Sequence, residues 1–258
     1  MTTVLVTGAS AGFGAAIAER FLADGARVVA AARRTAPLSE LAQRHPDRVL
    51  PLQLDVTDRA AVERALDGLP AAYAEIDVLV NNAGLALGLE PAQRAEPDDW
   101  DRMIATNCTG LVHLTRLVLP GMVARGQGTV VNLGSAAGEF PYPGGNVYGA
   151  TKAFVHQFTQ NLNADLIGTG VRATCIEPGL CGGTEFSSVR FGGDVRRAAA
   201  VYEGTSPLSP QDIADVVAWT VARPAHVTIN VVSMMPNCQS FSGLTVRRFV
   251  QPTDERRP

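Results

Sequence analysis

Lysine is nearly absent from this 258-residue sequence. Lys152 is the only lysine, and every other residue of the lysine and arginine total is an arginine. Arginine is planar and always charged, whereas lysine is a compact charge whose pKa moves readily on burial. The single lysine among many arginines suggests that a guanidinium cannot replace the ammonium group at position 152. Lys152 is therefore the first candidate functional residue.

Other scarce features narrow the class of protein. The four cysteines, Cys108, Cys175, Cys181 and Cys238, show no CxxC or Cys/His spacing, so we expect reduced thiols and no metal site. The net charge is −3 without a basic block, which argues against a nucleic-acid partner. Apolar runs are too short to span a bilayer, and the N-terminus lacks a basic leader segment. We therefore expect a cytoplasmic protein with no membrane partner.

Hydrophobic residues make up 46% of the chain and charged residues 18%, which suits one large globular domain. Apolar, partly β-branched segments alternate with helical patterns. We expect strands over residues 3–7, 27–32, 49–54, 76–80, 129–133, 171–177 and 227–232. We expect helices up to residue 23, over 38–44, up to 69, over 97–122 and 148–167, and from 210. This alternation predicts an α/β fold in a single domain: a doubly wound, seven-stranded parallel sheet with helices on both faces.

A glycine-rich turn follows the first expected strand and opens the first helix. It contains Gly8, Ser10, Gly12, Phe13 and Gly14, in the spacing GxxxGxG rather than GxGxxG. Glycines allow the backbone to turn tightly and to approach a pyrophosphate, which the helix N-terminus attracts. The turn is therefore a candidate dinucleotide-binding loop; the alternative is a purely structural turn.

The end of the second expected strand favours NADP over NAD. Enzymes that use NAD usually carry an acidic residue about 20 residues beyond the glycines, bonded to the ribose 2′-hydroxyl. Arg33 and Arg34 occupy that region and no carboxylate does, which suits a 2′-phosphate; the alternative is a solvated basic turn. Further candidates for the cofactor site follow later strands: Asp55, Val56, Asn82, Ala83, Gly84, Pro178 and Gly179.

Tyr148 and Lys152 lie four residues apart where a helix is expected to begin, which places both side chains on one face. An ammonium one turn away lowers the pKa of a phenol, so the pair is a candidate general acid/base; the alternative is an ordinary helix surface. Ser135 follows the carboxyl end of the fifth expected strand, where its hydroxyl could orient a substrate oxygen. Asparagine is unfavourable inside a helix, so the position of Asn107 in the expected helix requires an explanation. Three are open: Asn107 carries a chain of water molecules, it accepts a hydrogen bond from the backbone, or it is a tolerated polar residue without a role.

Residues 180–209 form a long segment with only a weak helical pattern, which is typical of a lid or binding loop. The loop contains Glu185 and Arg190. An anionic substrate requires a cation, and Arg190 is the candidate; the alternative is a solvated loop arginine.

Together these features resemble the short-chain dehydrogenase/reductase family. The resemblance rests on Thr7-Gly8-x-x-x-Gly12-x-Gly14, Asn81-Asn82-Ala83-Gly84, Asn107, Ser135, Tyr148-x-x-x-Lys152 and Pro178-Gly179, in the family's order. Residues 81–88, 144–155 and 176–186 resemble the bacterial NADP-dependent 3-hydroxy acid dehydrogenases, a group also called malonic semialdehyde reductase, serine 3-dehydrogenase or L-allo-threonine dehydrogenase. The resemblance covers residues 1–248 as one domain and leaves 249–258 as a polar C-terminal tail.

The resemblance implies a Rossmann-like fold and an NADP(H)-dependent oxidoreductase acting on CH–OH groups. Its substrates would be short 3-hydroxy acids (3-hydroxypropionate, serine, L-allo-threonine) and the matching 3-oxo acids or semialdehydes. By resemblance, Tyr148 exchanges a proton with the substrate, and Lys152 lowers the Tyr148 pKa and holds the nicotinamide ribose. Ser135 then orients the carbonyl, and Asn107 anchors a water leading to Lys152. Ser135, Tyr148, Glu185 and Arg190 are the expected substrate-binding residues.

The resemblance leaves two other functions open. Sulfoacetaldehyde reductases, or reductases of another small carbonyl, look similar over the same segments. A dinucleotide-binding regulatory protein without catalysis is the more remote alternative, because it would be expected to have lost Tyr148, Lys152 or Ser135. Relatives are commonly tetramers paired through the helices that carry Asn107 and Tyr148, so we expect a homotetramer.

Overall fold

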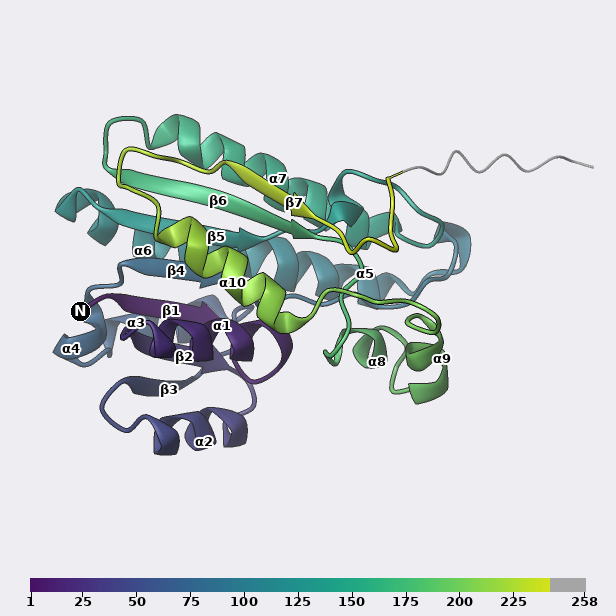
Figure 1. The fold of residues 1–258 in the computed structure, drawn as a ribbon, viewed down its shortest axis with the longest axis horizontal. Coiled ribbons are helices and arrows are strands. Elements are labelled where there is room, and N and C mark those ends of the chain that lie inside the picture. Colours follow the sequence, from purple (N-terminus) through teal and green to yellow (C-terminus); the bar gives the residue numbers. More distant parts are fainter. Residues whose placement is uncertain (242–258) are drawn as a thin grey trace, which may run out of the picture.

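The computed structural model describes residues 1–241, and all of the strands there run parallel in one sheet (Figure 1). The strands are β1 (Thr3–Thr7), β2 (Arg27–Ala32), β3 (Val49–Gln53), β4 (Val78–Asn81), β5 (Gly128–Leu133), β6 (Val171–Pro178) and β7 (Val231–Met234). Their spatial order is β3-β2-β1-β4-β5-β6-β7. The order reverses between β1 and β4, and such a switch point opens a crevice at the carboxyl ends of the strands.

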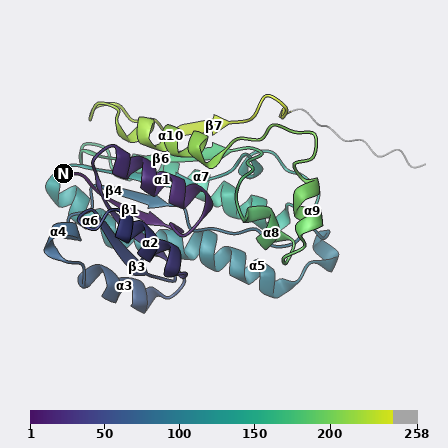
Figure 2. The ribbon, with the colours of Figure 1, turned by 60° about the horizontal axis from the view of Figure 1, so that its bottom comes forward.

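Helices cover both faces of the sheet (Figure 2). They are α1 (Gly12–Ala23), α2 (Ala36–Arg44), α3 (Arg59–Asp67), α4 (Ala71–Ala74), α5 (Pro97–Ile104), α6 (Leu111–Arg125), α7 (Asn146–Asp165), α8 (Phe186–Arg190), α9 (Val195–Ala200) and α10 (Pro210–Val221). Apolar side chains of α1, α2 and α10 form the core on one face, and those of α3, α6 and α7 form it on the other. The central strand β1 is fully buried, as its continuous apolar sequence requires. The predicted fold class is confirmed.

One predicted strand boundary is wrong, and the expected weak helical pattern of the loop over 180–209 is observed. The last strand was expected over residues 227–232, but β7 begins at Val231, which pairs with Cys175 of β6. The residues before it form a turn in which the Val227 amide donates to the Pro224 carbonyl. The loop over 180–209 contains two short helices, α8 and α9, and Asp194 caps α9 by accepting from two backbone amides.

The single helix expected over residues 97–122 is interrupted. α5 and α6 are joined by a π-helical segment, Ala105–Gly110, which contains Asn107. Gly110 lies so close to the loop after β3 that a Cβ atom there would be 2.7 Å from the Val56 carbonyl oxygen. A wider helical turn accommodates this contact and directs Asn107 inward, and π-bulges are frequent at functional sites.

A buried polar network joins the middle of the sheet to the helices beneath it. The Asn81 amide donates to the Thr115 hydroxyl at 2.9 Å and to the Asn132 side chain at 2.8 Å, and Asn132 donates to Thr159 at 2.9 Å. These bonds fix β4 and β5 against α6 and α7. Because buried polar groups are costly when unpaired, this network holds the strand ends that carry the site in one register.

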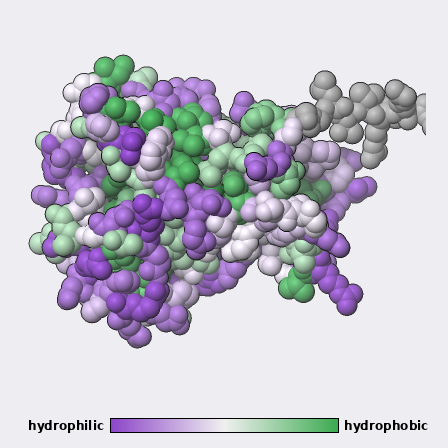
Figure 3. All heavy atoms as spheres, in the orientation of Figure 1, coloured by the Kyte–Doolittle hydropathy of each residue, from purple (hydrophilic) through white to green (hydrophobic). Residues whose placement is uncertain are grey.

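Hydrophilic residues cover much of the face in Figure 3, and apolar ones gather near β6 and β7. Within residues 1–241 no helix has the length and apolar character required to cross a membrane. The predicted tail, residues 249–258, and the domain boundary at 248 lie outside the described residues.

Candidate active site

The carboxyl ends of the strands open into a cavity of about 920 Å³. Most of the site residues predicted from the sequence line it: Gly8, Ser10, Gly12, Phe13, Arg33, Arg34, Asp55, Val56, Asn82, Ala83, Gly84, Ser135, Tyr148, Lys152, Pro178, Gly179, Glu185 and Arg190. Gly14 and Asn107 are absent from the lining and lie directly behind it. The fold therefore brings the predicted residues together, although they span the chain from residue 8 to residue 190.

The glycine turn is shaped by contacts that exclude side chains. Gly8 has φ +66°, a conformation that suits glycine. A Cβ atom on Gly14 would be 2.3 Å from the Gly8 carbonyl oxygen, so the first turn of α1 packs directly on the loop. The N-terminus of α1 has no side-chain cap. Gly12 and Phe13 of its first turn line the cavity, so the first turn of α1 borders the cavity without a side-chain acceptor on its amides, as an anion-binding turn requires.

Asn82 fastens the end of β4 to the glycine turn. Its side-chain amide donates to the Thr7 carbonyl at 2.8 Å, and the Thr7 hydroxyl accepts from the backbone amides of Asn82 and Ala83 at 3.0 and 2.9 Å. These bonds hold the carboxyl ends of β1 and β4 side by side. Asn82 therefore has a structural role at the switch point in addition to its predicted place in the cofactor site.

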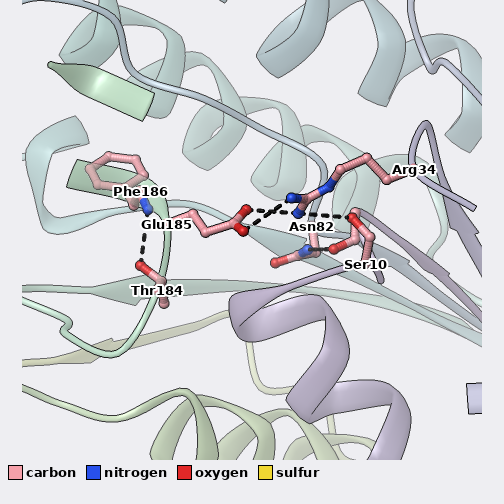
Figure 4. A network of polar contacts seen from close by, with 7 residues as sticks. Ser10, Arg34, Asn82, Thr184, Glu185 and Phe186 are labelled. Carbon is pink, nitrogen blue, oxygen red and sulfur yellow. Dashed lines mark hydrogen bonds and ion pairs between the residues drawn. The ribbon is translucent and has the colours of Figure 1, made fainter. Parts of the chain in front are cut away.

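Arg33 and Arg34 follow β2 and are exposed at one end of the cavity. Arg34 reaches across it to Glu185: the two guanidinium nitrogens lie 3.0 and 2.7 Å from the two carboxylate oxygens, and Ser10 lies 3.4 Å away (Figure 4). The ion pair raises the pKa of Arg34 and lowers that of Glu185. Both side chains are more than half exposed, so the pair contributes little stability.

The position of Glu185 differs from its predicted role. We expected a substrate-binding carboxylate, but Glu185 points to Arg34, at the end of the cavity where cofactor binding was predicted (Figure 4). Sequence spacing shows that Glu185 lies in the loop, but it does not show which way the side chain turns. Glu185 is therefore better described as a contact between the loop and the Arg34 end of the site.

Asp55 lies where β3 ends, in the same part of the cavity as Arg33. Burial opposes ionisation of its carboxyl group, but hydrogen bonds from Thr57 and the charge of Arg33 outweigh this and lower the pKa. The carboxylate accepts from the Thr57 amide at 2.9 Å and from the Thr57 hydroxyl at 2.7 Å. Asp55 therefore presents a fixed, ionised group beside Val56.

Tyr148, Lys152 and Ser135 line the same part of the cavity, since the Ser135 hydroxyl is hydrogen-bonded to Tyr148 and Lys152 lies beside the Tyr148 ring. Tyr148 and Lys152 are both buried on α7, with the Lys152 Nζ atom 5.9 Å from the centre of the Tyr148 ring. Nζ donates to the Leu133 carbonyl at 2.7 Å. The Ser135 hydroxyl accepts from the Ala137 amide at 3.1 Å, which fixes its position at the end of β5.

The expected direction of the Tyr148 pKa is wrong for this structure. Burial raises the pKa of Tyr148 to about 12, and the smaller effects of the Ser135 hydroxyl and the Arg190 charge oppose it. Burial also lowers the pKa of Lys152 to about 8. The spacing of Tyr148 and Lys152 placed them on one face, but it did not reveal that both groups are desolvated. In this arrangement Tyr148 is a protonated phenol at neutral pH.

Asn107 is buried and its side chain is fully engaged. Its oxygen accepts from the Leu85 amide at 2.9 Å, and its nitrogen donates to the Leu85 carbonyl at 2.9 Å and to the Thr151 hydroxyl at 3.0 Å. One of the three expectations, an acceptor of a backbone bond, is thus observed. Through Thr151, which precedes Lys152, Asn107 links the segment after β4 to α7.

Arg190 lies beside Tyr148, in surroundings that the sequence did not predict. Its guanidinium carbon is 5.4 Å from the ring centres of Tyr142 and Tyr148 and 5.8 Å from that of Phe186. Tyr142 and Phe186 were missed as site residues. The position of Tyr142 between Pro141 and Pro143, shortly before Tyr148, is the signal that could have found it.

Among residues 1–241, one group of potential metal ligands is compact: the donor atoms of His156, Cys175 and Glu177 lie within 4.8 Å of one another. The His156 Nδ1 and Glu177 Oε1 atoms are 2.6 Å apart, and burial raises the pKa of the Cys175 thiol to about 12. This spacing is that of a hydrogen-bonded pair beside a protonated thiol.

Comparisons with known proteins agree with this geometry. A family model described as short chain dehydrogenase matches residues 2–191. The chain is 59% identical over 245 residues to "NADP-dependent 3-hydroxy acid dehydrogenase YdfG" of Salmonella typhi, covering 95% of this chain and 99% of that protein. It is 46% identical over 246 residues to "Serine 3-dehydrogenase" of Rhizobium radiobacter, covering 95% and 98%.

A solved structure extends the likeness to three dimensions. "The Closed form of serine dehydrogenase complexed with NADP+" has a TM-score of 0.95 and 56% sequence identity, covering 96% of this chain and 100% of that one. These relatives match nearly the whole chain, which agrees with the resemblance that the sequence motifs indicated over residues 1–248. The chain therefore belongs to the short-chain dehydrogenase family.

Proposed function

We propose that the protein is an NADP(H)-dependent oxidoreductase that interconverts short 3-hydroxy acids and their 3-oxo acids or semialdehydes. The observation that carries the proposal is the meeting of Tyr148, Ser135 and Lys152 with a cation, Arg190, at one end of a cavity that begins at the glycine turn. The relatives named above, a 3-hydroxy acid dehydrogenase and a serine 3-dehydrogenase, support it.

The residues present fit a dinucleotide. Gly14 has no room for a Cβ atom, and the uncapped N-terminus of α1 faces the cavity, as a pyrophosphate requires. Arg33 and Arg34 would hold the 2′-phosphate, since a guanidinium has five N–H donors and Glu185 engages only part of those of Arg34. The remaining contacts would come from Ser10, Gly12, Phe13, Asp55, Val56, Asn82, Ala83, Gly84, Lys152, Pro178 and Gly179. The bound nicotinamide supplies or accepts the hydride.

Tyr148 performs the proton transfer. Because its pKa is raised to about 12, the phenol keeps its hydrogen at neutral pH and can donate it to the carbonyl oxygen during reduction. The Ser135 hydroxyl orients that oxygen. Lys152, with a pKa of about 8, is mainly charged at neutral pH and stabilises the phenolate that forms on Tyr148.

Arg190 holds the acidic group of the substrate. Within the described residues it takes part in none of the ion pairs between side chains, and it lines the cavity next to Tyr148. A carboxylate therefore finds a guanidinium without a competing carboxylate. Candidate substrates are malonic semialdehyde and 3-hydroxypropionate, serine and L-allo-threonine.

The second candidate is a reductase of sulfoacetaldehyde, because a sulfonate would satisfy Arg190 equally well. The test is the decay of NADPH absorbance with purified protein and three substrates: malonic semialdehyde, sulfoacetaldehyde and propanal. We expect the highest kcat/KM with malonic semialdehyde. Preference for the sulfonate would favour the second candidate, and preference for propanal would exclude an anion site. Absence of turnover with every carbonyl would support the remote alternative, a non-catalytic NADP-binding regulatory protein.

We also propose a cytoplasmic homotetramer. Aromatic and aliphatic side chains are partly exposed on neighbouring helices of one face, with Ile104 45% and Phe154 42% accessible. At the sheet edge, β7 is incompletely covered and Trp219 of α10 is 47% accessible. Two such regions suit two kinds of subunit contact. The mass in solution, measured by light scattering after size exclusion, tests this: a monomer would contradict it.

A further inference from the structure

The Tyr142 side chain is held by close packing at the end of the cavity where we expect the substrate. A Cβ atom on Gly145 would be 2.7 Å from the Tyr142 ring, and one on Gly144 would be 2.3 Å from the Leu89 carbonyl oxygen. The backbone between β5 and α7 therefore turns tightly around this side chain. Tyr142 also packs beside the buried group that contains Tyr148, Leu85 and Met103, so its ring is held in place.

Arg190 is oriented by polar contacts as well as by rings. Its Nε donates to the Gly88 carbonyl at 3.3 Å, and one terminal nitrogen donates to the Tyr142 hydroxyl. A guanidinium has five N–H donors, so other donors remain for a ligand. A half-buried charge that faces a cavity without a carboxylate partner favours an incoming anion.

The hydrogen of the Tyr142 hydroxyl group is available to donate a hydrogen bond. A hydroxyl can donate one hydrogen and accept through two lone pairs. Because Arg190 donates to this oxygen, the hydrogen of Tyr142 points elsewhere, and the described residues offer it no acceptor at hydrogen-bonding distance. Tyr142 and Arg190 thus present O–H and N–H donors at the same place.

We propose that Tyr142 is a specificity-determining residue: its hydroxyl and the Arg190 guanidinium together bind the substrate carboxylate and set its distance from Tyr148. This inference rests on the proposed function and deepens it. The Arg190 guanidinium carbon lies 5.4 Å from the Tyr148 ring centre. Hydrogen bonds to a carboxylate and to a carbonyl each span about 2.7–2.9 Å. A guanidinium this close to the Tyr148 ring favours a short spacer between the two groups, as in a 3-oxo acid, over the spacer of a longer acid.

The test compares kcat/KM for malonic semialdehyde, succinic semialdehyde and propanal in wild-type protein and in Tyr142→Phe. Phenylalanine keeps the ring against Gly145 and removes only the hydroxyl. A hydrogen bond to a charged group contributes enough for a change of about tenfold or more. We therefore expect the malonic semialdehyde to propanal ratio of kcat/KM to fall at least tenfold, mainly through KM. The preference over succinic semialdehyde should also shrink.

A matched control is Tyr202→Phe, which removes another phenol from the same cavity, one that bonds Ser187 at 2.7 Å. It should leave both ratios unchanged. Equal losses with acid and propanal in Tyr142→Phe would mean that Tyr142 only supports the structure, which overturns the inference. If Tyr142→Phe does not fold, Arg190→Gln tests the same site and should lower the same ratio. If wild-type protein shows no preference for acids over propanal, the proposed function itself fails.

Discussion

Asn107→Ala should separate the structural and catalytic contributions of the π-helical segment. The substitution removes three buried hydrogen bonds, two to the Leu85 backbone and one to Thr151. Leu85 and Thr151 are themselves buried, so the abandoned groups have no access to water. Each unsatisfied buried group costs about 1–3 kcal/mol. For three such groups we therefore expect the free energy of unfolding to fall by about 3–9 kcal/mol, a large part of the total of about 5–15 kcal/mol for a protein.

The activity should fall as well, because Thr151 precedes Lys152 and the lost bond loosens the position of α7, which carries Tyr148 and Lys152. Asn163→Ala is the matched control: Asn163 lies on the same helix and bonds the Ala173 backbone amide and carbonyl, both at 2.8 Å, away from the cavity. Urea unfolding and NADPH oxidation should be measured on both variants at a temperature where both are folded. We expect both variants to lose similar amounts of stability, and we expect kcat to fall only in Asn107→Ala. A loss of stability below about 1 kcal/mol with unchanged kcat in Asn107→Ala would refute this account.

Two further predictions concern protons and the cofactor. The kcat/KM for semialdehyde reduction should fall as pH rises through about 8, where Lys152 loses its charge, whereas Tyr148 keeps its proton until far higher pH; a profile that is flat to pH 10 would contradict this. Arg34→Ala should weaken NADPH binding at least tenfold, as expected for a charge-assisted hydrogen bond, and should affect NADH far less. Fluorescence titration checks this, and equal weakening of both cofactors would contradict the role of Arg34.

The sequence predicted most of the framework that places the site. Alternating apolar and helical segments led to the correct sheet, because strands buried on both faces read as continuous apolar runs. The Tyr148 and Lys152 spacing placed both side chains on one helix face, and polar residues after each strand converged at one edge of the sheet. These features follow from local periodicity, which the sequence records directly.

The features that the sequence did not predict depend on tertiary contacts. The raised pKa of Tyr148 follows from burial beneath residues distant in the chain. The direction of Glu185 depends on the reach of Arg34 from β2 across the cavity. The π-helical segment at Asn107 ends at Gly110, which lies against Val56; this contact with a distant loop is not visible in the helical pattern of the sequence.

The role of Tyr148 is the central claim, and Tyr148→Phe tests it most directly. The substitution removes the phenol oxygen and keeps the ring, which packs near Phe186 with ring centres 5.7 Å apart. General acid–base catalysis contributes about 10²–10⁴-fold, so NADPH-dependent reduction of malonic semialdehyde should fall at least a hundredfold, with NADPH binding retained in fluorescence titration. A variant that keeps more than about a tenth of the wild-type kcat would contradict the assignment of Tyr148 as the proton donor.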